Sequence, residues 1–190
     1  MDLRTAHDRA RDVFDRAAHR VTDWTAPTPC ADWSTRDLVN HLVSEQLWVP
    51  HLVGGETVEQ VGDRYDGDLL GADPLDAWTA ASAVSRLAWD GVPDELPVHL
   101  SHATVPAREY RWQMTLDLAV HGWDLATATG HDPGIGDDLA QALHAEFADQ
   151  VADWVEAGIF APPVPVPDAA GPLARLVALL GRDPGWRPSR

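Results

Sequence analysis

The stretch LDLAVHGWDL, residues 116–125, lies in the middle of a proline-free segment that spans residues 107–128 and is followed by Gly130. Most of its residues are apolar, yet it carries a carboxylate at Asp117 and an imidazole at His121. On a helix, residues four positions apart lie one above the other on the same face. The stretch therefore predicts a helix, set among apolar neighbours, that presents Asp117 and His121 together.

The sequence on both sides of this segment is also typical of helices. Apolar residues recur at three- and four-residue steps along residues 3–21, Ser34 and Asp37 resemble a capping box, and Asp73 precedes Pro74 as an N-cap. We expect Pro50 and the Gly54–Gly55 pair to end the second helix. The predicted helices span residues 3–21, 35–47 or slightly beyond, 74–89, 107–128, 136–156 and 173–180.

The remaining segments predict little regular structure. Residues 96–105 alternate weakly between apolar and polar, which fits a short strand pair or an extended loop. Residues 161–167 are rich in proline and predict an extended arm. The sequence therefore predicts an all-α fold with a bundle over residues 1–160, and an arm and short helix over residues 161–190 that pack on it as part of one domain.

Composition excludes several classes of partner. The 190 residues carry 30 acidic side chains against 14 basic ones, all arginine, for a net charge of −16. Binding to nucleic acid or to an anionic membrane gains affinity from clustered basic residues, so we expect neither partner. The single cysteine, Cys30, excludes an internal disulfide. No signal segment or membrane-spanning apolar run is evident, so we expect a cytoplasmic protein.

Asp117 and His121 have a plausible third partner in His41. His41 lies in the apolar stretch of residues 37–45, within the predicted second helix. Two imidazoles and one carboxylate can hold a divalent metal and leave coordination positions open, and bundle cores are where such sites are built. The spacing alone leaves an alternative open, in which Asp117 and His121 simply pair with each other.

Three motifs, in this order along nearly the whole chain, resemble the metal-binding family built on the mycothiol-dependent maleylpyruvate isomerase N-terminal domain, which belongs to the DinB-like four-helix bundles. They are TPCADW with RDLVNH at residues 28–33 and 36–41, LAVHGWDLATATG at residues 118–130, and PLARLVALLGRDP at residues 172–184.

The resemblance implies a DinB-like four-helix bundle that binds a divalent metal through His41, Asp117 and His121. Zinc is the expected metal, with nickel, iron and manganese as alternatives. The family usually has glutamate where this chain has Asp117, which is one methylene shorter. The isomerase also carries a C-terminal domain for which these residues leave no room, so we do not expect maleylpyruvate isomerisation itself.

Further candidates lie around the predicted ligands. Glu45 follows His41 by four residues and is either a ligand or general base, or a surface residue at the helix end, which we favour. His102 is a candidate catalytic residue near a loop, and Asp124 a candidate hydrogen-bond acceptor for a metal-bound histidine. The candidate substrate-binding residues are Trp48, His51 and Trp112, and Trp33 and Trp123 are further aromatic candidates.

These observations favour one function and leave others open. We expect a metal-dependent enzyme that uses a small thiol, mycothiol by resemblance, or a metal-activated water on a small electrophilic substrate. The alternatives are a non-catalytic bundle that binds a metal or small ligand, and a helical interaction module without a metal. A monomer or a homodimer fits each reading. We expect His7 and His19, on the first helix, to face solvent.

Overall fold

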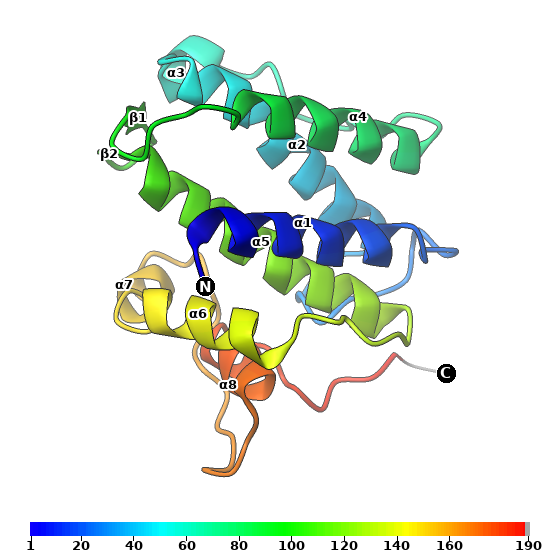
Figure 1. Ribbon diagram of the computed structural model, residues 1–190. Coiled ribbons are helices and arrows are strands. Elements are labelled where there is room, and N and C mark those ends of the chain that lie inside the picture. The colour runs from blue at the N-terminus through cyan, green and yellow to red at the C-terminus, as the bar shows by residue number, and fades with distance from the viewer. Residues whose placement is uncertain (189–190) are drawn as a thin grey trace.

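The computed structural model describes residues 1–188 and is mostly helical, with one two-stranded sheet (Figure 1). Along the described chain the elements are α1 (Leu3–Ala18), α2 (Thr35–Val53), α3 (Val58–Val61), α4 (Pro74–Ala88), β1 (Pro97–His99), β2 (Thr104–Pro106), α5 (Ala107–Ala128), α6 (Asp137–Phe147), α7 (Val151–Glu156) and α8 (Pro172–Leu179). The all-α class, the hairpin option for residues 96–105 and the bounds of α5 are thereby confirmed.

Two helix predictions were wrong in their ends. The predicted helix over residues 136–156 is two helices, because the chain turns after Phe147, and this turn lets Trp154 of α7 pack against Phe147 at 5.2 Å between ring centroids. Pro50 does not end α2, which continues to Val53 and ends at Gly54, as predicted from the Gly54–Gly55 pair. Proline within a helix loses one backbone hydrogen bond, and burial of the neighbouring Val49 and Leu52 offsets that loss.

Two helix pairs form the bundle. α1 packs on α5, and α2 packs on α4, as their neighbouring ribbons in Figure 1 show. Gly122 allows the close approach of α1 and α5, because a Cβ atom there would lie 2.7 Å from Val13 Cγ1 and 3.1 Å from the Phe14 backbone nitrogen. The main apolar core fills the space between these helices and includes Phe14, Leu42 and Leu118.

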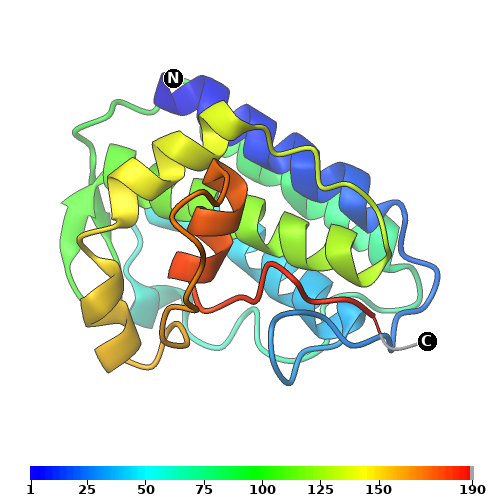
Figure 2. The same ribbon diagram turned by 90° about the horizontal axis from the view of Figure 1, so that it is seen from below.

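The C-terminal third of the chain lies against this bundle. Seen from below, α6 and α8 lie in front of the bundle and pack against each other (Figure 2). Leu176, Val177 and Leu180 of the α8 region are buried in the same core as the residues of α1 and α5. A smaller apolar cluster, which includes Val49, Val98 and Met114, closes the bundle at the hairpin end. Among the described residues, no helix is both long and apolar enough to cross a membrane.

Candidate metal centre

Three side chains from two helices converge inside the bundle. α2 presents His41, and α5 presents Asp117 and His121 one helical turn apart. His41 Nε2 lies 3.2 Å from Asp117 Oδ2, and His121 Nε2 lies 3.3 Å from Asp117 Oδ1. Each residue offers one donor atom such that all three atoms lie within 4.8 Å of one another. The structure therefore brings the three predicted ligands together.

The types of ligand atom and the hydrogen bonding of Asp117 both fit a divalent metal. Asp117 Oδ2 is buried and makes no hydrogen bond of acceptable geometry with any described residue. His41 Nε2 lies 3.2 Å from this oxygen without the geometry of a hydrogen bond, so a cation in front of the oxygen would supply the interaction that it lacks. Two imidazole nitrogens and a carboxylate are ligands that zinc, nickel and iron accept in proteins. The residues present thus fit such a metal.

Without a metal, the pKa values of all three predicted ligands are shifted from their ordinary values. Burial by itself lowers the pKa of His121, but the charge of Asp117, helped by hydrogen bonds to Asp117 and Asp124, raises it to about 9. The pKa of His41 is also raised, because Asp117 outweighs the effect of burial. The pKa of Asp117 is held well below its usual range, since the two histidines outweigh its burial. His121 is therefore protonated at neutral pH unless a metal takes the place of its proton.

Asp124 orients His121 from behind. His121 Nδ1 lies 3.0 Å from Asp124 Oδ2, so this nitrogen donates to the carboxylate and Nε2 is left to face Asp117. A carboxylate in this position is typical of metal-binding histidines. Asp124 is fully buried and receives a second donor, Arg182 Nη2, at 3.1 Å.

Arg182 is the residue that the sequence reasoning missed. It follows α8, is 7% exposed, and also donates to the Leu180 carbonyl at 2.9 Å. Arg182 lies in the motif at residues 172–184, but the resemblance that this motif carries implies no role for the arginine. Gly181, just before Arg182, lets the chain pass close to Ala161. It has φ of +78°, and a Cβ there would lie 2.6 Å from the Ala161 carbonyl oxygen.

The loop before α2 supplies an aromatic wall. The Thr28 hydroxyl lies 3.1 and 3.0 Å from the carbonyl oxygens of Cys30 and Trp33, which ties the loop together. Trp33 stacks on His121, with ring centroids 5.5 Å apart and planes at 21°, and contacts His41 at 4.9 Å between centroids. The indole thus restricts the orientation of both predicted histidine ligands.

Cys30 offers an alternative donor but a poor one. With His121 and Asp124 it forms a second group whose donor atoms lie within 4.8 Å of one another. His121 Nδ1 and Asp124 Oδ2 are already bonded to each other, and Arg182 Nη2 lies 3.5 Å from Cys30 Sγ. Burial raises the pKa of the Cys30 thiol to about 11, although Arg182 opposes the shift. The thiol therefore stays protonated at neutral pH.

Two cavities open beside the three predicted ligands. The larger, of about 540 Å³, is lined by Trp33, His41, Asp117 and His121 together with Cys30 and Arg182. The smaller, of about 250 Å³, is lined by His41, Asp117, Glu45, Tyr110 and His102. Ile159 and Phe160 line both cavities. The centre is therefore reachable from two directions.

Glu45 faces the smaller cavity, so our preference for a surface position at the helix end was wrong. It is half-buried, and burial together with the charge of Asp117 raises its pKa to about 7. A carboxyl group with that pKa can accept or donate a proton near neutral pH. His102, on the turn of the hairpin, is exposed and lies at the rim of the same cavity.

The other predicted residues lie elsewhere. The walls of both cavities are formed without Trp48, His51 and Trp112. His51 is engaged on both ring nitrogens, by Glu56 Oε1 at 2.8 Å and by the Tyr65 hydroxyl at 2.7 Å.

His7 corrects a second expectation, because it is 7% exposed and not solvent-facing. Its Nδ1 lies 3.1 Å from Thr115 Oγ1 of α5. Burial of the ring lowers the pKa of His7 to about 3. The sequence did not indicate this burial, because His7 lies among charged residues on α1.

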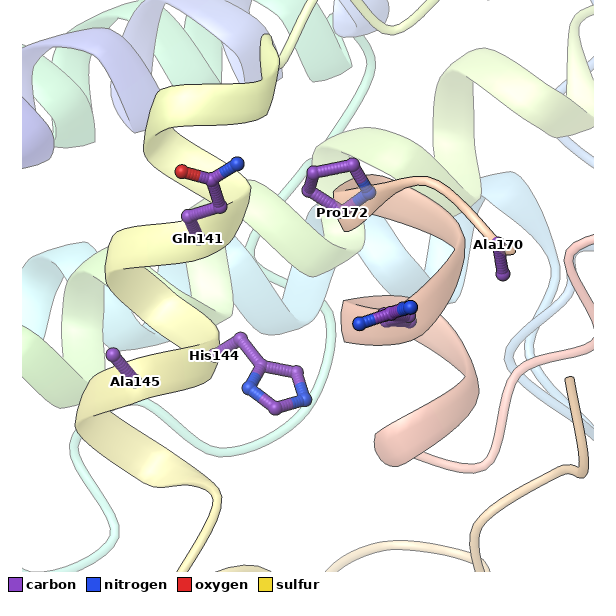
Figure 3. Close-up of a pocket in the computed structure, with 6 residues that line it drawn as sticks. Gln141, His144, Ala145, Ala170 and Pro172 are labelled. Carbon is purple, nitrogen blue, oxygen red and sulfur yellow. The ribbon is translucent and has the colours of Figure 1, made fainter. Parts of the chain in front are cut away.

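A further cavity, of about 380 Å³, lies between α6 and the start of α8 (Figure 3). Gln141, His144 and Ala145 form one wall, and Ala170 and Pro172 form the other. None of the predicted ligands lies on it, so the chemistry described above is concentrated at the first two cavities.

Comparison with known proteins places this geometry in context. A family model described as the mycothiol maleylpyruvate isomerase N-terminal domain matches residues 3–126, which include His41, Asp117, His121 and Asp124. Two uncharacterized proteins of Mycobacterium tuberculosis, from strains CDC 1551 / Oshkosh and ATCC 25618 / H37Rv, are each 32% identical over 186 residues. Each alignment covers 96% of this chain and 98% of the relative.

Among solved structures, the mycothiol-dependent maleylpyruvate isomerase and a point mutant of it have similar folds. Their TM-scores are 0.60 and 0.64, at 16% identity, and each alignment covers 83% of this chain and 73% of the other. At that identity the likeness establishes the fold and leaves the reaction to be argued from the residues.

Proposed function

The chain belongs to the family of the mycothiol maleylpyruvate isomerase N-terminal domain, and from this premise we propose that it binds one divalent metal ion through His41, Asp117 and His121. The observation that carries the proposal is the convergence of these three side chains around a buried Asp117 oxygen that has no hydrogen-bond partner among the described residues. We expect zinc, with nickel, iron or manganese as alternatives.

The proposal extends to an enzyme that acts with a low-molecular-weight thiol, mycothiol or a close analogue, on a small electrophilic substrate. Structural metal sites are usually closed by four protein ligands, whereas catalytic ones keep a position open. Here three protein ligands lie beside two cavities of about 540 and 250 Å³, which supports a catalytic role over a purely structural one.

The chemistry divides between the metal and the protein. When bound, the metal would stabilise the ionised form of a coordinated thiol or water. Asp124 and Arg182 hold His121 in its orientation, and the Trp33 ring packs against both imidazoles. Glu45 lines the smaller cavity together with His41 and Asp117, and we assign to it the acceptance of the proton that such an ionisation releases.

An external thiol is part of the proposal because the protein has no suitable thiol of its own. Cys30 is the only cysteine, and the pKa of its thiol is raised to about 11. A cytoplasmic location, where small thiols are kept reduced, belongs to the same proposal.

The metal assignment is tested by metal analysis of protein purified without an affinity tag. We expect one equivalent of metal in the wild type and loss of most of it in His41→Ala. His51→Ala is the matched control, since His51 also lies on α2 but is bonded to Glu56 and Tyr65. Stoichiometric metal that survives His41→Ala would overturn the ligand assignment.

The thiol is tested separately with cobalt(II)-substituted protein. We expect mycothiol to produce a thiolate-to-cobalt charge-transfer band, and its S-methyl derivative to produce none. If cobalt binds at one equivalent and mycothiol leaves the spectrum unchanged, the thiol part of the proposal fails and hydrolysis by activated water becomes the better reading.

A further inference from the structure

A polar cleft lies on the side of α5 that faces away from the candidate metal centre. It has a volume of about 210 Å³ and is lined by Arg4, His7, Asp8, Arg11, Arg86, Trp89, Asp90 and Arg111. His7 contacts Thr115 of α5, which precedes Asp117 by two residues. The side chains of Thr115 and Asp117 are therefore about 200° apart around the helix. The cleft is therefore a separate site.

The cleft gathers positive charge in a chain that has little of it. Four of the 14 arginines line it, against the two carboxylates Asp8 and Asp90, although the chain as a whole carries a net charge of −16. Arg11 is paired with Asp8 at 3.2 Å. Within residues 1–188, Arg4, Arg86 and Arg111 make no ion pair. Three arginines around the cleft therefore keep their charge without a paired carboxylate, although the chain has an excess of acidic residues.

Arg111 is held in place as part of this wall. It is 6% exposed, its guanidinium lies 4.3 Å from the centroid of the Trp89 ring, and it donates to the Trp89 carbonyl at 2.8 Å. Burial and the nearby charge of Arg4 lower the pKa of Arg111. A guanidinium that is fixed, desolvated and repelled by a neighbouring cation is one that an anion would stabilise.

His7 adds a hydrogen-bond acceptor among these donors. The Thr115 hydroxyl donates its single hydrogen to the Arg111 carbonyl at 2.6 Å, so its contact with His7 requires that His7 Nδ1 carry the hydrogen. Burial and the charges of Arg111 and Arg11 keep the ring neutral. His7 Nε2 is therefore an unprotonated acceptor, it has no partner among the described residues, and it belongs to a ring that lines the cleft.

We propose that this cleft binds a small oxyanion that carries a hydroxyl group, with monohydrogen phosphate as the best match. The arginines would donate to the anionic oxygens, and His7 Nε2 would accept from the hydroxyl. The four arginines and two aspartates that line the cleft leave two net positive charges, which would balance the two negative charges of that anion. An oxyanion without a hydroxyl, such as sulfate, would leave the acceptor opposite an oxygen lone pair.

The test is isothermal titration calorimetry of the full chain with inorganic phosphate, sulfate and methyl phosphate at constant ionic strength. At about pH 8, methyl phosphate is a dianion without a hydroxyl, because the second pKa of a phosphate ester is about 6. We expect phosphate to bind about tenfold or more tightly than either analogue, since a buried acceptor penalises a ligand that lacks its donor. Equal affinities for the three anions would overturn recognition of the hydroxyl.

Matched variants locate the site. Arg4→Gln/Arg86→Gln should weaken phosphate binding by about tenfold or more, since each lost arginine removes a charge-assisted contact. Arg16→Gln/Arg20→Gln removes the same charge from exposed positions outside the cleft and should leave the affinity unchanged. Asp117→Asn should also leave it unchanged, which separates this site from phosphate bound at a metal. No detectable binding by the wild type, or equal effects of the two double variants, would overturn the proposal.

Discussion

Arg182 and Asp124, which are 58 residues apart in the sequence, form a buried ion pair with Nη2 and Oδ2 3.1 Å apart. The same carboxylate oxygen accepts from His121 Nδ1 at 3.0 Å. The last segment of the chain is thereby connected to a predicted metal ligand on α5 through one shared acceptor. Substitutions in the C-terminal segment should therefore alter the orientation of His121 at the candidate metal centre.

Replacing Arg182 with methionine should destabilise the protein by about 3–5 kcal/mol, because it leaves the charge of fully buried Asp124 without its cation. Urea denaturation measures the change. The double variant Arg182→Met/Asp124→Asn should recover part of the loss, since it removes the stranded charge as well.

Arg108→Met is the control for this substitution. Arg108 pairs with Glu95 at the exposed surface, so its loss should cost less than about 1 kcal/mol. If Arg182→Met were as mild as Arg108→Met, the buried pair would not hold the C-terminal segment in place.

Asp124→Ala should weaken metal binding by about 10- to 100-fold, as expected when the acceptor behind a metal-bound histidine is lost. The measurement is a competition titration against a chromophoric chelator. Asp153→Ala, an exposed carboxylate on α7, should leave the affinity as in the wild type. Equal affinity in Asp124→Ala and the wild type would contradict a role for Asp124 in orienting His121.

In metal-free protein, Asp117→Asn should lower the pKa of His121 from about 9, because the charge of Asp117 is what outweighs burial of the ring. NMR titration of the ring protons after chelator treatment measures this value. The wild-type pair contributes stability in full below the unfolded pKa of about 6.5 and loses that contribution as the pH rises towards 9. A His121 pKa that does not respond to Asp117→Asn would show that Asp124 alone controls it.

His7 should make the protein less stable in acid. Its pKa is about 3 when folded, against about 6.5 for an unfolded histidine, so the unfolded state binds the extra proton between these values. This contribution is complete above about pH 6.5 and is lost as the pH falls towards 3, by up to about 1.4 kcal/mol per pH unit. Urea denaturation at a series of pH values should show a shallower slope for His7→Gln, whereas His19→Gln, at an exposed position of the same helical region, should keep the wild-type slope.

Gly122→Ala should destabilise the contact between α1 and α5 by about 1–3 kcal/mol, as overpacking of a tight interface does. The added methyl would lie 2.7 Å from Val13 Cγ1. In thermal denaturation the double variant Gly122→Ala/Val13→Ala should be more stable than the sum of the two single effects predicts, since the shorter side chain relieves the clash. Strict additivity would indicate that the backbone of Phe14, 3.1 Å from the added atom, is the dominant obstacle.

Much of the fold could be predicted because it depends on local signals. Residues 107–128 form α5 with the predicted bounds, and Asp73 caps α4 by accepting from the backbone nitrogens of Leu75 and Asp76. The turn between α6 and α7 could not be predicted, since it depends on the packing of Trp154 against Phe147 and not on a proline or glycine between them. The extension of α2 beyond Pro50 likewise depends on tertiary burial of Leu52.

For the site, helical spacing predicted that Asp117 and His121 lie together, the apolar surroundings of His41 made it the candidate third partner, and the resemblance pointed to the same three residues. The roles of Arg182 and Trp33 could not be read from spacing, because both residues reach the centre from irregular segments that are distant in sequence. Burial of His7 was hidden for a similar reason, since its partner Thr115 lies 108 residues away.

The cavities on either side of the centre share four wall residues, His41, Asp117, Ile159 and Phe160. Ile159 is 64% exposed, so this partition is thin on its outer side. Two adjacent cavities therefore offer separate space for two small molecules beside the same carboxylate and imidazole. For a reaction between a thiol and an electrophile, this arrangement favours kinetics in which both substrates are bound together before either product leaves, and it disfavours a ping-pong order.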